Sequence, residues 1–129
     1  MKSIDTNVVV RVLTGDDEAQ ARSAGRAIAE GVHITSGVLM ETEWVLRSTY
    51  RWERARITDA LRALVIEASI SVHDKQAVMW ALDRYAVGAD WADMLHLIDS
   101  AGREAFLTFD LRVGAQAGSG APIPVELVA

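Results

Sequence analysis

Short apolar runs alternate with longer segments of helical periodicity, and this alternation constrains the fold more than any other feature of the chain. The apolar runs, which predict strands, are residues 1–4, 32–35, 70–73, 105–109 and 123–127. The segments whose apolar spacing predicts helices are residues 8–13, 16–30, 37–50, 54–67, 75–87 and 91–103. Strands that alternate with helices form mainly parallel sheets covered on both faces. We therefore predict a three-layer α/β/α sandwich with a mainly parallel central sheet.

Two boundaries of these elements carry further expectations. Ser36 precedes the third helical segment and is expected to cap it, because a hydroxyl oxygen accepts from free N–H groups of a first turn. Residues 114–124 are rich in Gly, Pro and Ser, and they are expected to form a loop before the last strand.

The length and composition limit the remaining classes of protein. A chain of 129 residues, half of them hydrophobic, predicts one domain over residues 1–129 with its own core. The absence of cysteine excludes disulfide scaffolds, thiol catalysis and zinc sites built from thiolates. There is no signal-peptide pattern and no apolar stretch near the roughly 20 residues that span a bilayer. We expect a soluble, cytoplasmic protein with no membrane partner.

Four acids occupy positions where the chemistry of such a fold is usually found. Asp5 and Asp110 follow apolar runs directly, and therefore lie at the carboxyl ends of predicted strands. Glu41 and Asp93 lie near the starts of predicted helices. In a parallel sheet the strand ends and helix starts share one edge, where ligands bind. We therefore expect these four carboxylates to converge.

Convergence of four carboxylates would require a compensating cation, because several like charges cannot all stay ionised within a few ångströms. Hard oxygen ligands without cysteine or clustered histidine favour Mg²⁺ or Mn²⁺. A metal in such a site can deprotonate a bound water and stabilise a phosphoryl transition state. The sequence thus points to phosphodiester hydrolysis by metal-activated water.

Two of the four acids, and Asp90 beside a third, also have a purely structural interpretation. Asp5 and Asp110 could serve only as helix N-caps, and for each residue alone the two interpretations have about even weight. Asp90 precedes Asp93 by three residues, as in a capping box, and a cap is its favoured role.

Two glutamates compete for the role near the start of the third helix. Glu43 has Arg47 four residues later, so a surface ion pair is its default interpretation. Glu41 has no basic partner at that spacing. Both glutamates flank the apolar face on a helical wheel, and the wheel therefore does not decide between them.

A cluster of arginines stands apart from the acids. The members of this cluster are Arg47, Arg51, Arg54, Arg56 and Arg62. Only Glu53 and Asp59 are acidic within residues 47–62, so the segment has a local charge of about +3. Tyr50 and Trp52 lie among the arginines and offer stacking surfaces. The segment is either a solvated helical hairpin with ion pairs or a phosphate-binding rim, with equal weight.

At these residues the chain resembles the PIN-domain ribonucleases, and most closely the VapC-type toxins of bacterial toxin–antitoxin pairs. The similar motifs are Ile4-Asp5-Thr6-Asn7, Leu39-Met40-Glu41-Thr42-Glu43-Trp44-Val45-Leu46, Asp90-Trp91-Ala92-Asp93 and Thr108-Phe109-Asp110. They occur in the family's order across nearly the whole chain. There are two departures: Leu111 stands where a basic residue is common, and Met94 where a small residue is usual.

The resemblance implies a metal-dependent endoribonuclease that holds Mg²⁺ or Mn²⁺. Its residue assignments are Asp5, Glu41, Asp93 and Asp110 as the catalytic and metal-binding acids, Asp90 as an accessory metal ligand, Thr6 and Asn7 as polar support, and Arg47, Arg51, Arg54 and Arg56 as candidate RNA contacts. It selects Glu41 over Glu43. It also implies a homodimer, an RNA substrate and a cognate antitoxin that wraps the toxin and blocks its acidic site.

Two other functions remain as alternatives. A PIN-like module kept only for protein contacts would be expected to have lost an acid, and here all four acids are present. A PIN nuclease acting on DNA would be expected to carry extra helical elements, which the chain lacks. A phospho-receiver domain is rejected, because the first strand ends in a single acid and no lysine follows Lys75.

Overall fold

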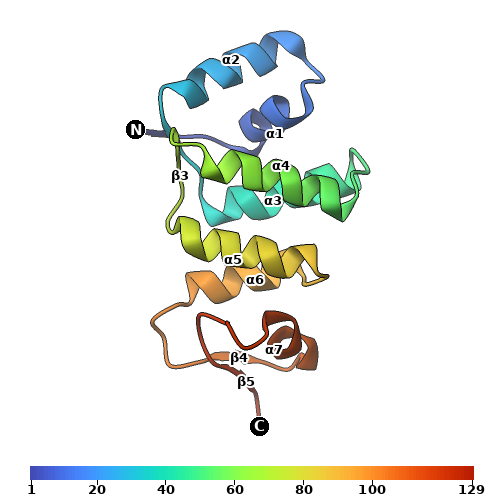
Figure 1. Ribbon diagram of the computed structural model, residues 1–129, viewed down its shortest axis with the longest axis vertical. Coiled ribbons are helices and arrows are strands. Elements are labelled where there is room, and N and C mark those ends of the chain that lie inside the picture. Colours follow the sequence, from blue (N-terminus) through green and yellow to red (C-terminus); the bar gives the residue numbers. More distant parts are fainter. The chain divides into compact units, whose positions relative to one another are not determined.

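The computed structural model describes residues 1–129, which form two compact units (Figure 1). Unit 1 is Met1–Lys75 and unit 2 is Gln76–Ala129. Each unit contains parallel strands and helices, so the predicted α/β class with parallel strands is confirmed. The assignment of residues 1–129 to a single domain stays a prediction.

Unit 1 contains a three-stranded parallel sheet and four helices. In chain order its elements are β1 (Lys2–Ser3), α1 (Thr6–Thr14), α2 (Glu18–Ala29), β2 (Val32–His33), α3 (Ser36–Ser48), α4 (Arg54–Ile66) and β3 (Ile70–Ser71). The strand order is β1-β2-β3, with Lys2 opposite Val32 and Val32 opposite Ile70. A helix follows both β1 and β2, as parallel connections require.

Three of the four helices of unit 1 begin at a capping side chain, whereas Glu53 before α4 makes no side-chain cap. Asp5 caps α1, Asp17 caps α2 and Thr35 caps α3. The fully buried side chains of this unit include Val9, Ile34, Leu39, Leu46, Ile57, Leu61 and Val65. Burial of such side chains supplies most of the favourable free energy of folding.

Unit 2 contains three helices and a two-stranded parallel sheet. Its elements are α5 (Lys75–Ala86), which begins at the last residue of unit 1, then α6 (Trp91–Asp99), β4 (Phe106–Thr108), α7 (Leu111–Ala117) and β5 (Val125–Leu127). Phe106 lies opposite Val125 in the pairing of β4 with β5. The rings of Tyr85 and Trp91 join α5 to α6 edge to face, with centroids 5.6 Å apart.

The structure corrects three boundaries. Residues 114–117 are not loop but the end of α7, which buries Val113 and Ala117 one turn apart. The helix at Trp91 ends at Asp99 rather than Arg103, because the following turn includes Gly102 at φ 87°. Thr35, not Ser36, caps α3: the Thr35 hydroxyl accepts from the Val38 N–H at 3.2 Å. None of the helices is long and apolar enough to cross a membrane.

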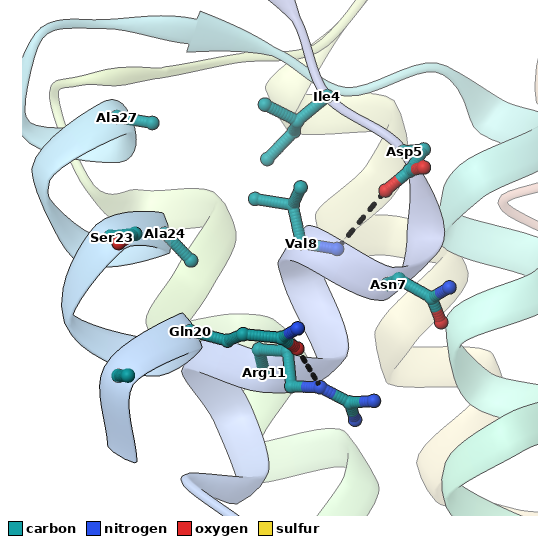
Figure 2. Close-up of a pocket in the computed structure, with 10 residues that line it drawn as sticks. Ile4, Asp5, Asn7, Val8, Arg11, Gln20, Ser23, Ala24 and Ala27 are labelled. Carbon is teal, nitrogen blue, oxygen red and sulfur yellow. Dashed lines mark hydrogen bonds between the residues drawn. The ribbon is translucent and has the colours of Figure 1, made fainter. Parts of the chain in front are cut away.

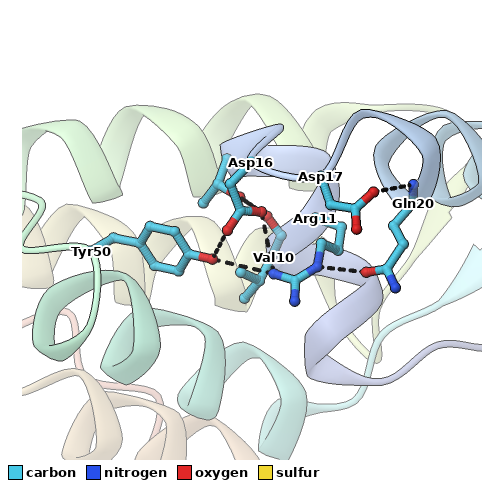
Figure 3. Close-up of polar contacts among 7 residues, drawn as sticks. Val10, Arg11, Asp16, Asp17, Gln20 and Tyr50 are labelled. Atoms are coloured by element: carbon cyan, nitrogen blue, oxygen red, sulfur yellow. Dashed lines mark hydrogen bonds and ion pairs between the residues drawn. The ribbon is translucent and has the colours of Figure 1, made fainter.

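A polar network links α1, the α1–α2 turn and Tyr50, the second residue after α3 (Figure 3). The Tyr50 hydroxyl donates to Asp16 Oδ2 at 2.5 Å, and Thr14 Oγ1 donates to Asp16 Oδ1 at 3.0 Å. Arg11 Nε donates to Gln20 Oε1 at 2.7 Å, and Arg11 Nη1 lies 3.3 Å from Asp16. Chiefly because of the Tyr50 hydrogen bond, the pKa of Asp16 lies below its ordinary value of 3.8.

Replacing Tyr50 by Phe should lower the free energy of unfolding at pH 7. It should also make this free energy less dependent on pH in the acidic range. A carboxylate whose folded pKa is lowered stabilises the fold above the unfolded pKa, and this contribution is lost as the pH falls through the folded pKa. The difference between wild type and Tyr50→Phe should therefore shrink below about pH 4. Urea unfolding between pH 7 and pH 3.5 measures it. A difference that stayed constant over this range would contradict the role of Asp16.

Candidate functional site

In unit 1, the structure brings Thr6 and Glu41 together beside Asp5. Asp5 follows β1 and caps α1, because its Oδ1 accepts from the Val8 N–H at 3.1 Å. The next residue, Thr6, is 7% exposed and donates its hydroxyl hydrogen to Glu41 Oε1 on α3. The second oxygens of both carboxylates accept no hydrogen bond. Asp5, Glu41 and Asn7 are exposed to solvent.

The structure distinguishes Glu41 from Glu43, whose environments the helical wheel could not tell apart. Glu43 is 5% exposed and pairs with Arg47 through Nε at 2.7 Å. The ion pair was predicted correctly, but its placement on the surface was wrong, because α3 buries Thr42, Glu43 and Leu46 together. A carboxylate buried and paired in this way cannot meet a solvent-borne substrate. Glu41 is the glutamate of α3 that is open to solvent.

In unit 2, Asp90 and Asp93 stand at the start of α6. Asp90 Oδ1 accepts from the Asp93 N–H at 2.9 Å and caps the helix, as predicted. The Asp93 side chain is half-buried, and its carboxylate has no hydrogen bond or ion pair. Burial raises the pKa of Asp93, and the negative charges of Asp90 and then Asp110 raise it further. Asp93 is thus a carboxylate whose charge is poorly compensated.

Asp110 has the opposite electrostatic environment, and the cause is Arg112. Asp110 Oδ1 accepts from the Arg112 N–H at 2.9 Å and from Arg112 Nε at 3.0 Å, while Oδ2 accepts from Nη2 at 2.9 Å. The side-chain hydrogen bonds from Arg112 are the largest cause that lowers the pKa of Asp110, and the same contact raises the pKa of Arg112. No role for Arg112 was predicted from the sequence. The signal was present, because an arginine two residues after a capping aspartate can donate hydrogen bonds to that carboxylate.

The donor set fits a hard divalent cation by its chemistry. The acids offer carboxylate oxygens only, and Asp5, Glu41 and Asp93 have no ion-pair partner. Within neither unit do three or more His, Asp or Glu side chains gather closely enough to form a complete metal site. The assignments of Asp5, Glu41, Asp90, Asp93 and Asp110 as metal ligands stay predictions, as do the support roles of Thr6 and Asn7.

A pocket of about 600 Å³ lies between α1 and α2, next to Asp5 (Figure 2). Asp5 and Asn7 line it at the start of α1, and Arg11 lines it further along the same helix. The apolar side chains that line the pocket are Ile4, Val8, Ala19, Ala24 and Ala27. The lining therefore combines apolar side chains with the Asp5 carboxylate and the Arg11 guanidinium.

The arginine segment is partly engaged in internal contacts. Arg47 pairs with the buried Glu43, and the Tyr50 hydroxyl binds Asp16, so neither side chain is fully available for a ligand. Arg56 stacks on Trp52, with its guanidinium carbon 3.9 Å from the ring centroid. Arg51 is exposed and follows α3. The predicted contacts of these arginines with RNA stay predictions.

The chain is an α/β protein with acids after its strands and at the starts of its helices. Comparison of the sequence with known families identifies the family to which it belongs. Residues 3–114 match the PIN domain, so the chain belongs to the PIN domain family. Members of this family are typically metal-dependent nucleases and commonly use Mg²⁺. No curated protein and no solved structure matches the chain. The matched segment contains all four predicted acids and extends over both units.

Replacing Asp90 by Asn should lower the pKa of Asp93 toward its ordinary value. Asn keeps the helix cap but removes the like charge that disfavours ionisation of Asp93. Titration of the side-chain carboxyl carbons by NMR measures this pKa. Glu104→Gln removes an exposed acid of the same unit, and we expect it to leave Asp93 unchanged. Equal pKa values of Asp93 in wild type and Asp90→Asn would show that Asp90 does not act on it.

Proposed function

We propose that the chain is a divalent-metal-dependent endoribonuclease and the toxin of a toxin–antitoxin pair. One observation carries this proposal: three acids of a PIN domain are accessible carboxylates that lack any ion-pair partner. These are Asp5 and Glu41 in unit 1 and Asp93 in unit 2. Accessible carboxylate oxygens that no basic side chain occupies are free to bind a divalent cation, which prefers such hard oxygen ligands.

The residues of the chain would share the work as follows. Asp5, Glu41, Asp93 and Asp110 would hold Mg²⁺ or Mn²⁺, with Asp90 as an accessory ligand. When bound, the metal ion would lower the pKa of a water and offset the charge of the phosphoryl group. The Val8 N–H holds the Asp5 carboxylate, and the Thr6 hydroxyl holds that of Glu41. Both side chains are therefore ordered before a ligand binds.

Arg112 would have a second role in this scheme. It neutralises Asp110 as the structure stands, through both carboxylate oxygens. A divalent cation on Asp110 would compete with this guanidinium, which could then contact a phosphate oxygen of the substrate, since planar bidentate binding suits both carboxylate and phosphate. Arg112 would thus pair with Asp110 when the metal ion is absent and contact the RNA backbone when the metal ion is bound.

Replacing any one acid by its amide should lower RNA cleavage by about 100-fold or more. We propose to incubate RNA and Mg²⁺ or Mn²⁺ with the wild type, Asp5→Asn, Glu41→Gln and Asp93→Asn, and to measure initial rates. EDTA should abolish cleavage, because carboxylates alone cannot supply the chemistry of the metal ion.

Two exposed glutamates serve as matched controls for these variants. Glu30→Gln in unit 1 and Glu104→Gln in unit 2 should cleave RNA at the wild-type rate. Equal cleavage by wild type and all three acid variants would overturn the residue assignment. Cleavage of single-stranded DNA but not RNA would instead favour a PIN nuclease that acts on DNA. No cleavage by the wild type would favour a non-catalytic PIN-like module for protein contacts.

We further propose that the partners are a cognate antitoxin and a second copy of the chain. The α1–α2 pocket supports the first proposal: its apolar lining and the adjacent Asp5 carboxylate fit a partner segment with apolar side chains and one basic side chain. Exposed apolar side chains support the second, since Phe109 is 84% exposed and Leu111 is 74% exposed.

Growth of cells that express the chain tests the antitoxin proposal. The chain should arrest growth, and co-expression of a short reading frame that neighbours its gene should restore growth. Ser23→Trp should prevent this rescue without lowering RNA cleavage, because Ser23 lines the α1–α2 pocket. Arg22→Trp places the same bulk on the adjacent position of α2, outside the pocket, and rescue should persist. Equal rescue of both variants would exclude the pocket as the antitoxin site.

A further inference from the structure

Two arginines near the junction of α3 and α4 have no acidic partner. Arg51 lies in the turn and Arg56 in the first turn of α4, and both are exposed. Arg51 makes no hydrogen bond or ion pair through its side chain, and the stack on Trp52 is the one contact of the Arg56 guanidinium. Glu53 lies between them in sequence and pairs with neither. Both guanidinium groups are therefore open to a ligand of negative charge.

Arg51 adopts a backbone conformation that favours glycine. Its φ is 59°, and it is the one non-glycine residue of the chain with positive φ. The end of α3 widens here: the Tyr50 N–H donates to Val45 O at 3.3 Å and the Trp52 N–H to Leu46 O at 3.0 Å. Glycine commonly ends a helix in this conformation without the steric cost of a Cβ. The turn therefore presents an arginine at a position where glycine would be less strained.

Arg56 forms the second part of the same surface. Its guanidinium lies over the Trp52 ring, with 3.9 Å between Cζ and the ring centroid. Trp52 is half-buried, whereas Arg56 is exposed. The indole ring supports a planar cation from one side, and the guanidinium, as the more exposed partner, offers a plane on which an aromatic base can stack.

We propose that Arg56, supported by Trp52, stacks on an unpaired base of single-stranded RNA and that Arg51 binds a neighbouring phosphate. This inference rests on the proposed ribonuclease function for its choice of RNA. A single strand is favoured over a duplex, because duplex bases stack on each other and expose no face. A nucleic acid is favoured over an acidic protein, because a carboxylate needs no planar stack to meet an arginine.

Binding of a fluorescently labelled, single-stranded RNA in EDTA tests the proposal without cleavage. Arg56→Lys keeps the charge but removes the planar group, so its affinity should fall by about fivefold or more. The slope of log K against log salt should stay unchanged. Affinity of this variant for a blunt RNA duplex should equal that of wild type, because no base is available for stacking there.

Arg51→Gly separates the proposed role from folding. The substitution relieves the positive φ, so the midpoint of thermal unfolding should stay equal or rise. Affinity for the single strand should nevertheless fall, and the salt slope should decrease by about 0.7, the value for one lost phosphate contact. The matched controls are Arg22→Lys on α2 and Arg103→Gly in the turn after α6, both at exposed arginines, and each should bind as wild type.

Two results would overturn the inference. The first is wild-type affinity of both Arg51→Gly and Arg56→Lys for the single strand; lost binding of the same variants to poly-glutamate would then assign the surface to a protein partner. The second is an equal loss of affinity for single strand and duplex.

Cleavage assays on the same samples separate this inference from the proposed function. A wild type that cleaves RNA while Arg56→Lys binds it normally would retain the nuclease and reject the stacking surface. A wild type that never cleaves RNA, but whose affinity for the single strand falls in Arg56→Lys, would reject the nuclease and retain the surface.

Discussion

Hydrogen bonds from helix N-termini to carboxylates are the interaction on which the placement of the acids depends. The strands are two or three residues long, and α1, α3 and α7 begin within three residues of a strand end. The first N–H groups of each helix have no partner within the helix. Asp5, Asp90 and Asp110 accept from these groups in α1, α6 and α7. The cap fixes the carboxylate without consuming it, because Asp5 and Asp90 each use one oxygen. Capping and catalysis are therefore compatible roles for the same side chain.

Local patterns were sufficient to predict much of the fold. Five apolar runs contain the five strands, and the caps at Asp5 and Asp90 follow from acids placed before predicted helical segments. The helix α7 was missed, because seven residues that include Gly114 carry too little periodicity to oppose the Gly-rich composition around them. Short-range signals thus predict where elements begin better than they predict whether a short helix forms.

The parts of the site that the sequence could not predict depend on contacts between elements. The hydrogen bond from Thr6 to Glu41 joins α1 to α3, and no spacing along the chain encodes it. The burial of Glu43 depends in the same way on which face of α3 packs inward. Resemblance to a family selected Glu41 over Glu43 as a catalytic acid, and this role stays a prediction; the structure shows that Glu41 is exposed and Glu43 is buried. The contact of Arg112 with Asp110, by contrast, joins residues two positions apart and is of the kind that proximity along the chain can predict.

Asp93 and Asp110 show that the same residue type in one unit can be tuned in opposite directions. Asp110 receives a guanidinium on both oxygens and titrates below its ordinary range, whereas burial and neighbouring acids raise the pKa of Asp93. A protein that needed only a helix cap would gain stability by pairing Asp93 as well. Leaving Asp93 unpaired beside two acids raises its pKa and so disfavours its charged form, and a divalent ion bound there, as proposed, would favour that form. The same reasoning applies with reversed charge at Arg51 and Arg56, which lack acids in a chain with an excess of them. A ligand of opposite charge would meet accessible carboxylates at Asp93 and accessible guanidinium groups at Arg51 and Arg56 without first displacing an ion pair.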